Sequence, residues 1–504
     1  MSKNTENSSN SYLVKGDLSG IQSFIFNIKS KDAAKSLKGR SFFLKILLEL
    51  GMQMVFDATN ISESSDISEA KISTSGGNFI LLLPLDPTEQ VDIIQHRLNK
   101  ALRFTGLNFI LVCTALKGDY QDALKQLNAK ARERKYNLFL QDQSFFEPYS
   151  RENFQKILSN KKWEKITIGL RKSEITHFLI EKSESGKPDT PLDIINNLIS
   201  LAGYQIIFGE KGVPLNKFLE SVFPIKEDKI ILFENLAKYG GKEGVEKLGI
   251  LAMDVDNLGI AVESEKKKKK HYKLDQELQA FFNDELRRII KKGYYEDRKG
   301  NRISKYKNKI YPVTAGGDDT MFVGKWNTLL DLAGDIRKAF LEKFEERGLS
   351  ISAALIIVKP NFPVVRFADL AEDALKEAKY SYENQKGNLH LLGEVLHWDL
   401  FEEEILKTRN EFNKYNKALI SSGLLAKARQ TAVKISEQKG ITLSDLWKMG
   451  YFMRDFGKKG ADIQTKHRKQ LQKSLSENNK LKSKTYRLIF PVAARLAEFD
   501  ARKK

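Results

Sequence analysis

The stretch YPVTAGGDDTMFVGKW, residues 311–326, is the starting point for interpreting the rest of the chain. Two apolar runs of β-forming residues flank a turn of two glycines and two aspartates, which predicts a β-hairpin. Gly316 and Gly317 supply the tight turn, and Asp318 and Asp319 lie side by side at its tip. Adjacent carboxylates repel each other unless a cation lies between them, so the hairpin indicates a Mg²⁺ or Mn²⁺ site. From these residues alone, an ordinary turn with solvated acids remains an alternative.

Charge and length narrow the class of protein. The 504 residues include 84 Lys and Arg against 65 Asp and Glu, a net charge of +19. A chain of this length suggests about three or four domains. The positive excess favours a polyanionic partner such as nucleic acid or nucleotides, although a generally lysine-rich proteome would produce the same excess.

A single cysteine, Cys113, lies in an apolar strand pattern. One thiol excludes a disulfide within the chain and argues against a cysteine-ligated zinc site. The polar residues 1–10 predict a disordered tail without a signal core. The single cysteine therefore predicts no zinc and fits a reducing cytoplasm. Because no apolar run reaches the length of a membrane span, we also expect no membrane partner and a cytoplasmic location.

The hairpin has an earlier counterpart in the chain. One strand ends at Asp17 and is followed by Gly76-Gly77-Asn78-Phe79, and another ends at Asp254 and is followed by Gly316-Gly317-Asp318-Asp319. The glycine pairs begin 59 and 62 residues after the two aspartates. A helix, a strand (residues 108–116 in the first copy and 350–358 in the second) and a second helix are predicted after each hairpin. This order indicates two copies of a βαββαβ module of the ferredoxin-like type, with chance coincidence as the alternative.

We therefore predict an α+β protein. It has a tail (residues 1–10), a first module (11–135), an inter-module domain of mixed or helical structure (136–245), a second module (246–399) and a C-terminal basic helical domain (400–504).

The acids of the second module are expected to meet at one sheet edge. In a ferredoxin-like sheet the first strand neighbours the central hairpin, so Asp254 would approach Asp318 and Asp319. Asp256 follows two residues later and points the same way if the strand continues. These four acids form an oxygen-only site that suits two Mg²⁺ or Mn²⁺ ions holding nucleotide phosphates, which is the arrangement of nucleotidyl transfer.

Other residues are candidates for contacting the nucleotide. Asn257 and Gly259 let the chain turn into a helix whose backbone N–H groups would face phosphate. Lys376 and Lys379 lie on a predicted helix and suit a triphosphate, although a surface role for either remains open. The lysine run 266–270 predicts a mobile loop, because like charges repel.

The first module is predicted to be degenerate. Asn78 and Phe79 replace the acid pair there, so we expect no catalytic metal in this copy. Gly76, Gly77 and Asn78 are the corresponding candidates for contacting a nucleotide.

Several motifs, in order over about residues 12–400, resemble the large polymerase-like subunit of type III CRISPR effector complexes. The first palm domain of that family is matched by GDLSGIQSFIF (16–26) and KGRSFFL (38–44). The second palm is matched by MDVDNLG (253–259), AGGDDT (315–320) and AEDALKEAK (371–379).

The resemblance implies an activity and partners. The family makes cyclic oligoadenylate from ATP when its complex binds target RNA, and its GGDD acids and first-strand aspartate hold the metals. Carried onto this chain, these residues are Asp318, Asp319 and Asp254. The implied partners are a multi-subunit complex containing crRNA, its small and backbone subunits, target RNA and ATP.

Two departures from the family pattern matter. Many members carry an N-terminal nuclease domain with a His-Asp metal motif, and many carry a cysteine-ligated zinc site between the palms. This sequence has no His-Asp dipeptide and one cysteine, so we expect neither single-stranded DNase activity nor that zinc site.

Three alternatives stay open. Some relatives without the nuclease join AMP from ATP to S-adenosylmethionine, and the motifs do not report the acceptor. A diguanylate cyclase relative would end its hairpin in Glu-Phe, whereas here the residues after Asp318 are Asp-Thr-Met. The third alternative is a non-enzymatic scaffold of an RNA complex, but in a scaffold the clustered carboxylates would repel each other with no metal ion to stabilise them.

Overall fold

The structure is a computed structural model. It describes residues 11–28, 33–62, 64–74, 77–103, 105–141, 163, 177–182, 195, 199–214, 224–226, 229–238, 244–264, 268–296, 302–315, 319–382, 385–416, 426, 429–430, 433, 447–448, 451, 454 and 457–501. The predicted tail, residues 1–10, lies outside the described residues.

The chain forms two compact units. One consists of Met1–Leu232, Asn257–Thr320 and Pro363–Ala368, and the other of Phe233–Asp256, Met321–Phe362 and Asp369–Lys504. Both units take residues from the predicted second module (246–399), so the five-part division of the sequence remains a prediction.

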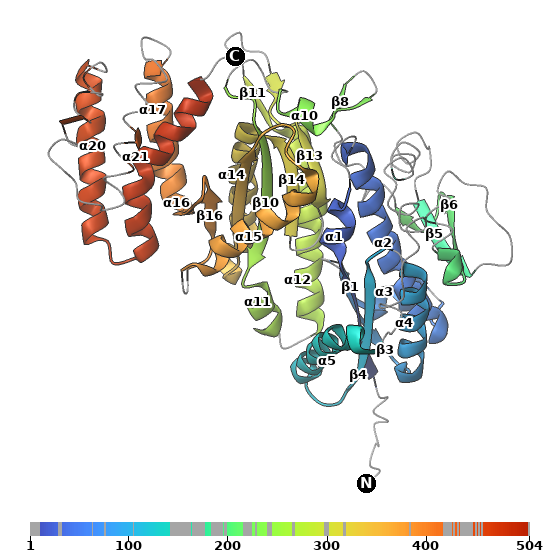
Figure 1. The fold of residues 1–504 in the computed structure, drawn as a ribbon. Coiled ribbons are helices and arrows are strands. Elements are labelled where there is room, and N and C mark those ends of the chain that lie inside the picture. The colour runs from blue at the N-terminus through green and yellow to red at the C-terminus, as the bar shows by residue number, and fades with distance from the viewer. Residues whose placement is uncertain are drawn as a thin grey trace. The chain divides into compact units, whose positions relative to one another are not determined.

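The first sheet has the predicted ferredoxin-like topology (Figure 1). Its strands are β1 (Ser11–Ser19), β2 (Lys71–Ser73), β3 (Asn78–Leu83) and β4 (Asn108–Leu116), in the order β2-β3-β1-β4. The central strand β1 pairs antiparallel with β3 and with β4. Helices α1 (Ile21–Phe26), α2 (Ala33–Ala58) and α3 (Ser64–Ala70) connect β1 to β2.

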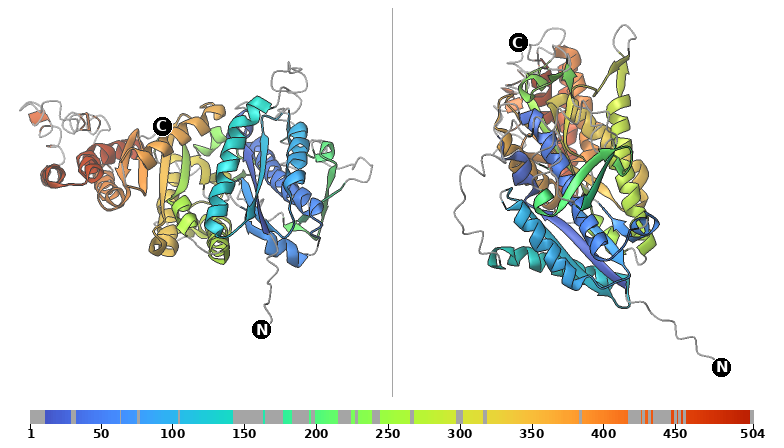
Figure 2. Two further views of the ribbon diagram at one scale, coloured as in Figure 1. Left: turned by 90° about the horizontal axis from the view of Figure 1, so that it is seen from below. Right: turned by 90° about the vertical axis from the view of Figure 1, so that its right-hand side faces the viewer.

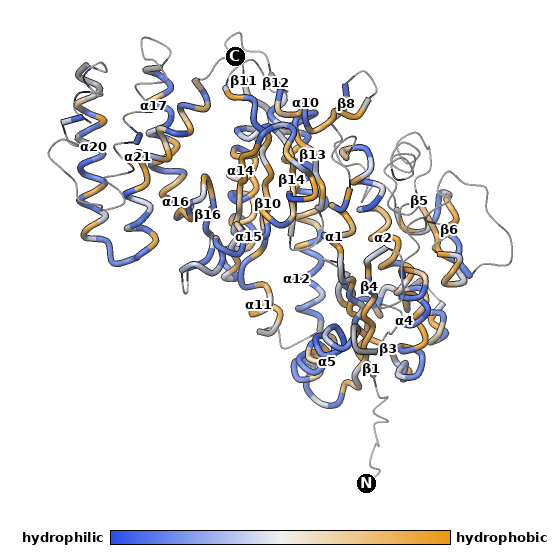
Figure 3. Tube along the Cα trace, in the orientation of Figure 1, coloured by the Kyte–Doolittle hydropathy of each residue, from blue (hydrophilic) through white to orange (hydrophobic). Residues whose placement is uncertain are grey.

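Helices cover both faces of this sheet, which explains why its strands are almost continuously apolar. Helix α5 (Tyr120–Gln141) packs its Leu124 and Leu127 against Leu13 and Ile110. Helices α2 and α4 (Thr88–Leu102) cover the other face. There the ring of Phe109 lies so close to Gly51 of α2 that an added Cβ would be 2.3 Å from it. Figure 3 shows the apolar character of β1, β3 and β4.

The second sheet repeats this strand order and extends it. Strands β10 (Leu248–Asp256), β13 (Ile310–Ala315), β14 (Asp319–Lys325) and β15 (Ser350–Val358) lie in the order β13-β14-β10-β15. Two strands absent from the sequence prediction, β16 (Asn388–Leu391) and β17 (Glu394–His397), continue the sheet, and β16 pairs parallel with β15. Helix α14 (Trp326–Phe344) packs on β10 and β15, and α15 (Phe367–Tyr380) precedes β16.

A helical segment separates β10 from β13. It contains α11 (Leu258–Ser264), α12 (Lys268–Ala280), a π-helical turn (Phe281–Glu285) and α13 (Leu286–Lys292), and a short hairpin of β11 (Tyr294–Glu296) and β12 (Arg302–Ser304) follows. The predicted mobile loop at residues 266–270 is wrong for Lys268–Lys270, which form the first turn of α12. Lysine is a good helix former, and Lys269 and Lys270 are exposed, so water screens their charges.

Helix α12 contacts the first module within its compact unit through buried and half-buried polar groups. Tyr120 Oη lies 2.8 Å from Nδ1 of His271. Ser73 Oγ donates to Oδ1 of Asp275 at 2.7 Å, and Gln279 Nε2 donates to Oγ1 of Thr74 at 3.0 Å. His271, Asp275 and Gln279 are spaced four residues apart, so one face of α12 makes all these contacts.

The remaining described segments are small strands and C-terminal helices (Figure 2). Between the modules lie β5 (His177–Lys182), β6 (Tyr204–Gly209), β7 (Val213–Pro214), β8 (Ile225–Lys226), β9 (Lys229–Ile230) and α10 (Phe233–Leu236). After β17 come α16 (Trp398–Leu400), a π-helical turn (Phe401–Ile405), α17 (Leu406–Asn416), α20 (Gly457–Ser476) and α21 (Lys480–Ala501). None of the described helices is long and apolar enough to span a membrane.

Candidate active site

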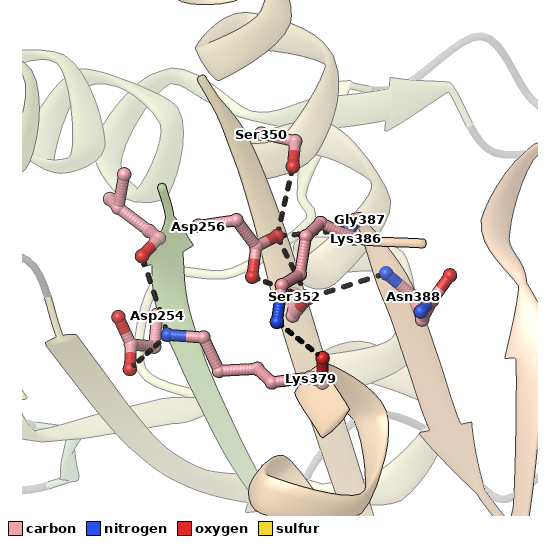
Figure 4. Close-up of polar contacts among 9 residues, drawn as sticks. Asp254, Asp256, Ser350, Ser352, Lys379, Lys386, Gly387 and Asn388 are labelled. Atoms are coloured by element: carbon pink, nitrogen blue, oxygen red, sulfur yellow. Dashed lines mark hydrogen bonds and ion pairs between the residues drawn. The ribbon is translucent and has the colours of Figure 1, made fainter. Parts of the chain in front are cut away.

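Asp254 lies near the end of β10, where the strand changes from apolar to polar. The preceding residues, Leu248–Met253, are buried. Oδ2 of Asp254 lies 2.7 Å from Nζ of Lys379, and the two side chains are 27% and 13% exposed (Figure 4). Nζ of Lys379 also donates to the carbonyl oxygen of Val255 at 3.3 Å. Asp254 is therefore a partly exposed carboxylate that is paired with the ammonium group of Lys379.

Asp256 has a different environment from Asp254. Its side chain is fully buried, and its carboxylate accepts hydrogen bonds from Ser350 Oγ (2.9 Å), Ser352 Oγ (2.8 and 2.9 Å) and the backbone N–H of Gly387 (2.9 Å). These donors occupy both carboxylate oxygens. The contacts argue against the predicted role of Asp256 as a metal ligand and give it a structural role between β10, β15 and the start of β16.

The end of helix α15, which carries Lys379, is held in place by two side chains, and Figure 4 shows the contact made by one of them, Lys386. Lys386 Nζ donates to the carbonyl oxygen of Lys379 at 2.6 Å. Asn388 Nδ2 donates to the carbonyl oxygens of Ala378 (3.0 Å) and Gln385 (2.7 Å). The bonds to Ala378 and Lys379 satisfy carbonyl groups that a helix end leaves without partners. Sequence reasoning missed both residues and the two serines, and the alternation of Ser350 and Ser352 with apolar residues was the one available signal.

Lys376, predicted to contact a triphosphate, forms a surface ion pair. Its Nζ lies 2.7 Å from Oε1 of Glu372, one helical turn away, and the side chains are 59% and 41% exposed. The hydrogen bond from Glu372 raises the pKa of Lys376. These contacts favour the surface role that the sequence left open.

The predicted acidic hairpin is described in its two strands. β13 ends at Ala315, and β14 begins at Asp319. Gly316, Gly317 and Asp318, and the side chain of Asp319, lie outside the described residues. Among the side chains that the structure does describe, no group of three or more His, Cys, Asp or Glu is placed to hold a metal ion. The role of Asp318 and Asp319 stays a prediction.

Asn257 makes the sharp turn that the sequence indicated. Its φ of 61° lies in the left-handed region, which asparagine tolerates better than most residues. Helix α11 begins at the next residue, and the N–H of Ala261 donates to the carbonyl oxygen of Asn257 at 2.9 Å. Gly259 is exposed, and a Cβ added there would meet nothing within 4 Å. Packing therefore does not require glycine at position 259.

The first module retains one acid at the corresponding place. Asp17 of β1 lies opposite Asn78 of β3. Burial raises the pKa of Asp17, and the charges of Lys15 and Lys135 partly offset this effect. The Gly77 turn is tight, with φ of 82°, and its carbonyl oxygen accepts from the N–H of Leu18 at 3.0 Å. Gly76 lies outside the described residues.

Phe79 occupies the position that aligns with Asp319. Its ring is fully buried, and an added Cβ on Gly16 would lie 2.3 Å from that ring. The ring also packs against Phe109, with the centroids 6.2 Å apart. The first module has therefore replaced the second hairpin acid with a core side chain.

Two family models match the chain in the order of its modules. The model described as "Cas10/Cmr2, second palm domain" matches residues 247–389, and the model described as "Csm1 subunit domain B" matches residues 10–155. The chain belongs to the Cas10/Csm1 family. This confirms the family indicated by the sequence motifs, and the second-palm model includes Asp254 and the hairpin.

Curated relatives in this family are longer than the chain. The Cas10/Csm1 single-strand-specific deoxyribonuclease (subtype III-A) of Methanocaldococcus jannaschii is 26% identical over 485 residues, covering 77% of this chain and 60% of the relative. The protein of the same description from Enterococcus italicus is 25% identical and covers 79% of this chain and 56% of the relative. The chain thus spans somewhat less than two thirds of these relatives.

Solved structures show the same fold. A Csm1-Csm4 cassette in complex with cA4 aligns with a TM-score of 0.71 at 17% identity, covering 98% of this chain and 70% of that one. A cassette in complex with one ATP aligns with the same TM-score and identity, covering 96% and 70%. At this identity the likeness supports the palm architecture alone.

Proposed function

We propose that the second palm of this Cas10/Csm1 protein is a nucleotidyltransferase that makes cyclic oligoadenylate from ATP. The observation that carries the proposal is the position of Asp254, partly exposed near the end of the buried strand β10, in a domain that matches the family's second palm. The similar Csm1-Csm4 cassettes have been solved with ATP and with cA4, which supports the same substrate and product here.

The proposed chemistry forms a bond between a ribose hydroxyl oxygen and the α-phosphorus of ATP, and it breaks the bond to pyrophosphate. Asp254, Asp318 and Asp319 are the residues that would hold divalent ions, which supply positive charge to phosphate oxygens when bound. Asp254 fits this use, because it is an oxygen donor that is partly open to solvent. Asp256 is left out of the proposed set, because protein donors already use its carboxylate.

Lys379 is proposed as a positioning residue. Its helix end is fixed by Lys386 and Asn388, and its ammonium group holds the Asp254 carboxylate in one orientation. A preorganised carboxylate loses less freedom when a ligand binds.

The proposed partners are those of a subtype III-A complex. They comprise a Csm4-like backbone subunit, small subunits, crRNA and a target RNA whose binding switches on synthesis. The similar Csm1-Csm4 subcomplex of the type III-A interference complex supports the first of these partners.

The decisive experiment combines the purified complex with target RNA, ATP and Mg²⁺ or Mn²⁺. Pyrophosphate release and mass spectrometry of the products, with and without S-adenosylmethionine, are the measurements. We expect adenylate rings that disappear in the double variant Asp318→Ala, Asp319→Ala. Undiminished synthesis in that variant would reject the site. An AMP adduct of S-adenosylmethionine would identify the other acceptor, and absence of calorimetric binding of Mn²⁺-ATP would indicate a scaffold.

A further inference from the structure

Strand β4 of the first module is an edge strand whose composition favours pairing with a further strand. It lies at the end of the order β2-β3-β1-β4, so one of its two sides pairs with β1 and the other faces away from the sheet. Its nine residues, NFILVCTAL, include no charged residue and no proline. An open edge with such a sequence is a template for a strand from another molecule.

Two amide side chains of α4 bind the outward backbone groups of β4. Asn99 Oδ1 accepts from the N–H of Phe109 at 2.7 Å, and Asn99 Nδ2 donates to the carbonyl oxygen of the same residue at 3.0 Å. Gln95 Oε1 accepts from the N–H of Leu111 at 2.8 Å. The Asn99 amide therefore makes the pair of bonds that a residue of a neighbouring antiparallel strand would make.

Two cationic side chains of α5 bind carbonyl groups of the same edge. Arg134 Nη1 donates to the carbonyl oxygen of Leu111 at 2.8 Å, and Lys130 Nζ donates to that of Cys113 at 3.0 Å. Arg134 Nη2 also donates to Oδ1 of Asp92 on α4 at 2.5 Å. One guanidinium group thus joins the two helices across the edge of the strand.

The spacing of these side chains matches that of the strand. Gln95 and Asn99 are four residues apart on α4, as are Lys130 and Arg134 on α5, and four residues of a helix rise about 6 Å. The outward backbone groups of a strand recur every second residue, which is about 6.8 Å. Each helix can therefore serve two successive outward residues of β4.

The second module closes the corresponding edge with strands instead of side chains. Strand β15 takes the place of β4 in the order of its sheet. It pairs with β16, and β16 pairs with β17. The second copy of the fold therefore shows that this edge accepts a strand when one is supplied.

We propose that Gln95, Asn99, Lys130 and Arg134, here called the edge cover, prevent β4 from pairing with β4 of a second copy of this chain. A second copy is the partner that fits, because two identical antiparallel strands are related by a two-fold axis and close as a dimer. A second copy also brings its own Lys130 and Arg134 to the same edge, where like charges repel. The inference goes beyond the proposed function, since it does not require the second palm to be active.

The test compares two double variants of the full chain with the parent by sedimentation velocity over a range of protein concentrations. Gln95→Ala with Asn99→Ala removes the amides, and Lys130→Ala with Arg134→Ala removes the cations. Alanine has the highest helix propensity, so both helices should be retained. We expect each variant to dimerise with a dissociation constant at least about tenfold below that of the parent, a change that one or two net hydrogen bonds supply.

Hydrogen exchange of residues 108–116 locates the association. In a dilute solution of the amide variant these backbone N–H groups should exchange faster than in the parent, because side chains no longer bind the outward ones. At high concentration the exchange should slow again as the dimer forms. His96→Ala on α4 and Arg132→Ala on α5 are the matched controls, since both residues are exposed, and they should behave as the parent does.

Two results would overturn the proposal. One is that the variants sediment as the parent does at every concentration. The other is association that leaves the exchange of residues 108–116 unchanged, which would place the contact on another surface. If one double variant loses its cooperative thermal transition, the other one decides the question, because the amides and the cations bind different backbone groups of the edge.

Discussion

Two aspartates on one strand show that the surroundings of a carboxylate decide whether it is open to a ligand. Asp254 and Asp256 lie on the same side of β10, as the strand period requires. Asp254 is partly exposed beside one lysine, whereas Asp256 is fully buried and accepts hydrogen bonds from three residues. Their spacing in the sequence is that of paired metal ligands. The serines and the backbone N–H that bind Asp256 come from residues 94 to 131 positions away. The sequence around Asp256 therefore does not indicate that its carboxylate is buried and hydrogen-bonded.

Asp254→Asn is expected to abolish nucleotide synthesis while leaving stability nearly unchanged. We expect a loss of about 100-fold or more in pyrophosphate release, because removing a residue that only supports a metal ligand already costs about 10–100-fold. The ion pair with Lys379 is partly exposed, so its loss should change the free energy of unfolding by less than about 1 kcal/mol. A variant that retains synthesis would remove Asp254 from the site.

Asp256→Ala is the matched opposite case. It leaves Ser350, Ser352 and the N–H of Gly387 without their acceptor, and hydrogen bonds to a charged group contribute roughly 1.5–3 kcal/mol each without adding fully. We expect a loss of about 3 kcal/mol in urea unfolding, and Ser350→Ala should cost less. A stable Asp256→Ala protein that no longer binds Mn²⁺ would show that Asp256 is a metal ligand.

At the scale of elements, hydrophobic patterns predicted the long strands and helices well. The predicted strands at residues 108–116 and 350–358 agree with β4 and β15, because each is a nearly continuous apolar run. Strands β16 and β17 have four residues each, too few for a periodic signal, and pairing with β15 and with each other defines them. The lysines of α12 form a helical turn because their helix propensity outweighs the repulsion between charges that are exposed to water.

Phe79→Asp should destabilise the first module without creating a metal site. The buried ring fills the space over Gly16 and packs against Phe109, and removing a buried phenylalanine costs about 3–5 kcal/mol before the charge is counted. Asn78→Asp is the control, since Asn78 is partly exposed and should tolerate the change. Thermal melting compares the two variants, and equal melting temperatures would contradict this account.

His467 makes the stability of the C-terminal helices depend on pH. It is 5% exposed and packs on Phe490 with the ring centroids 4.8 Å apart, and neither ring nitrogen has a hydrogen-bond partner among the described residues. Burial lowers the pKa of His467 to about 4 from 6.5. His467 therefore binds a proton below pH 6.5 in the unfolded chain, whereas in the folded chain it binds one only below about pH 4.

The contribution of neutral His467 to the free energy of unfolding is fully present above pH 6.5 and is lost as the pH falls toward 4. The loss should total about 3 kcal/mol, at 1.36 kcal/mol per pKa unit. Urea unfolding across this range measures it. His467→Leu should flatten the curve over the same interval, and an unchanged slope in that variant would place the pH dependence elsewhere.

At the scale of the whole molecule, the sequence predicted the repeat but not how its two copies share their packing. The matched pairs Gly76-Gly77 and Gly316-Gly317 predicted the strand order and the loss of the acid pair in the first copy. The contacts of α12 with the first module did not, because they join Ser73 and Tyr120 to residues 202 and 151 positions away. The compact unit that contains the first module also contains Asn257–Thr320, which the sequence assigned to the second.

A fragment of residues 246–399 should therefore not fold alone. It would expose the face of α12 that Tyr120 and Ser73 cover, including the buried His271 and Asp275. Co-expression with residues 1–245 should restore protection against limited proteolysis. A cooperative thermal transition in the isolated fragment would show that the second module does not depend on the first.

The ring of Phe79 also bears on how this duplicated chain evolves. Regaining an acid at that position would remove a core side chain and leave space over Gly16, while filling the space first would clash with the ring. Each order of events passes through a less stable protein. A return to an acid at position 79 would therefore need a compensating change around Gly16 and Phe109 before the first module regained its stability.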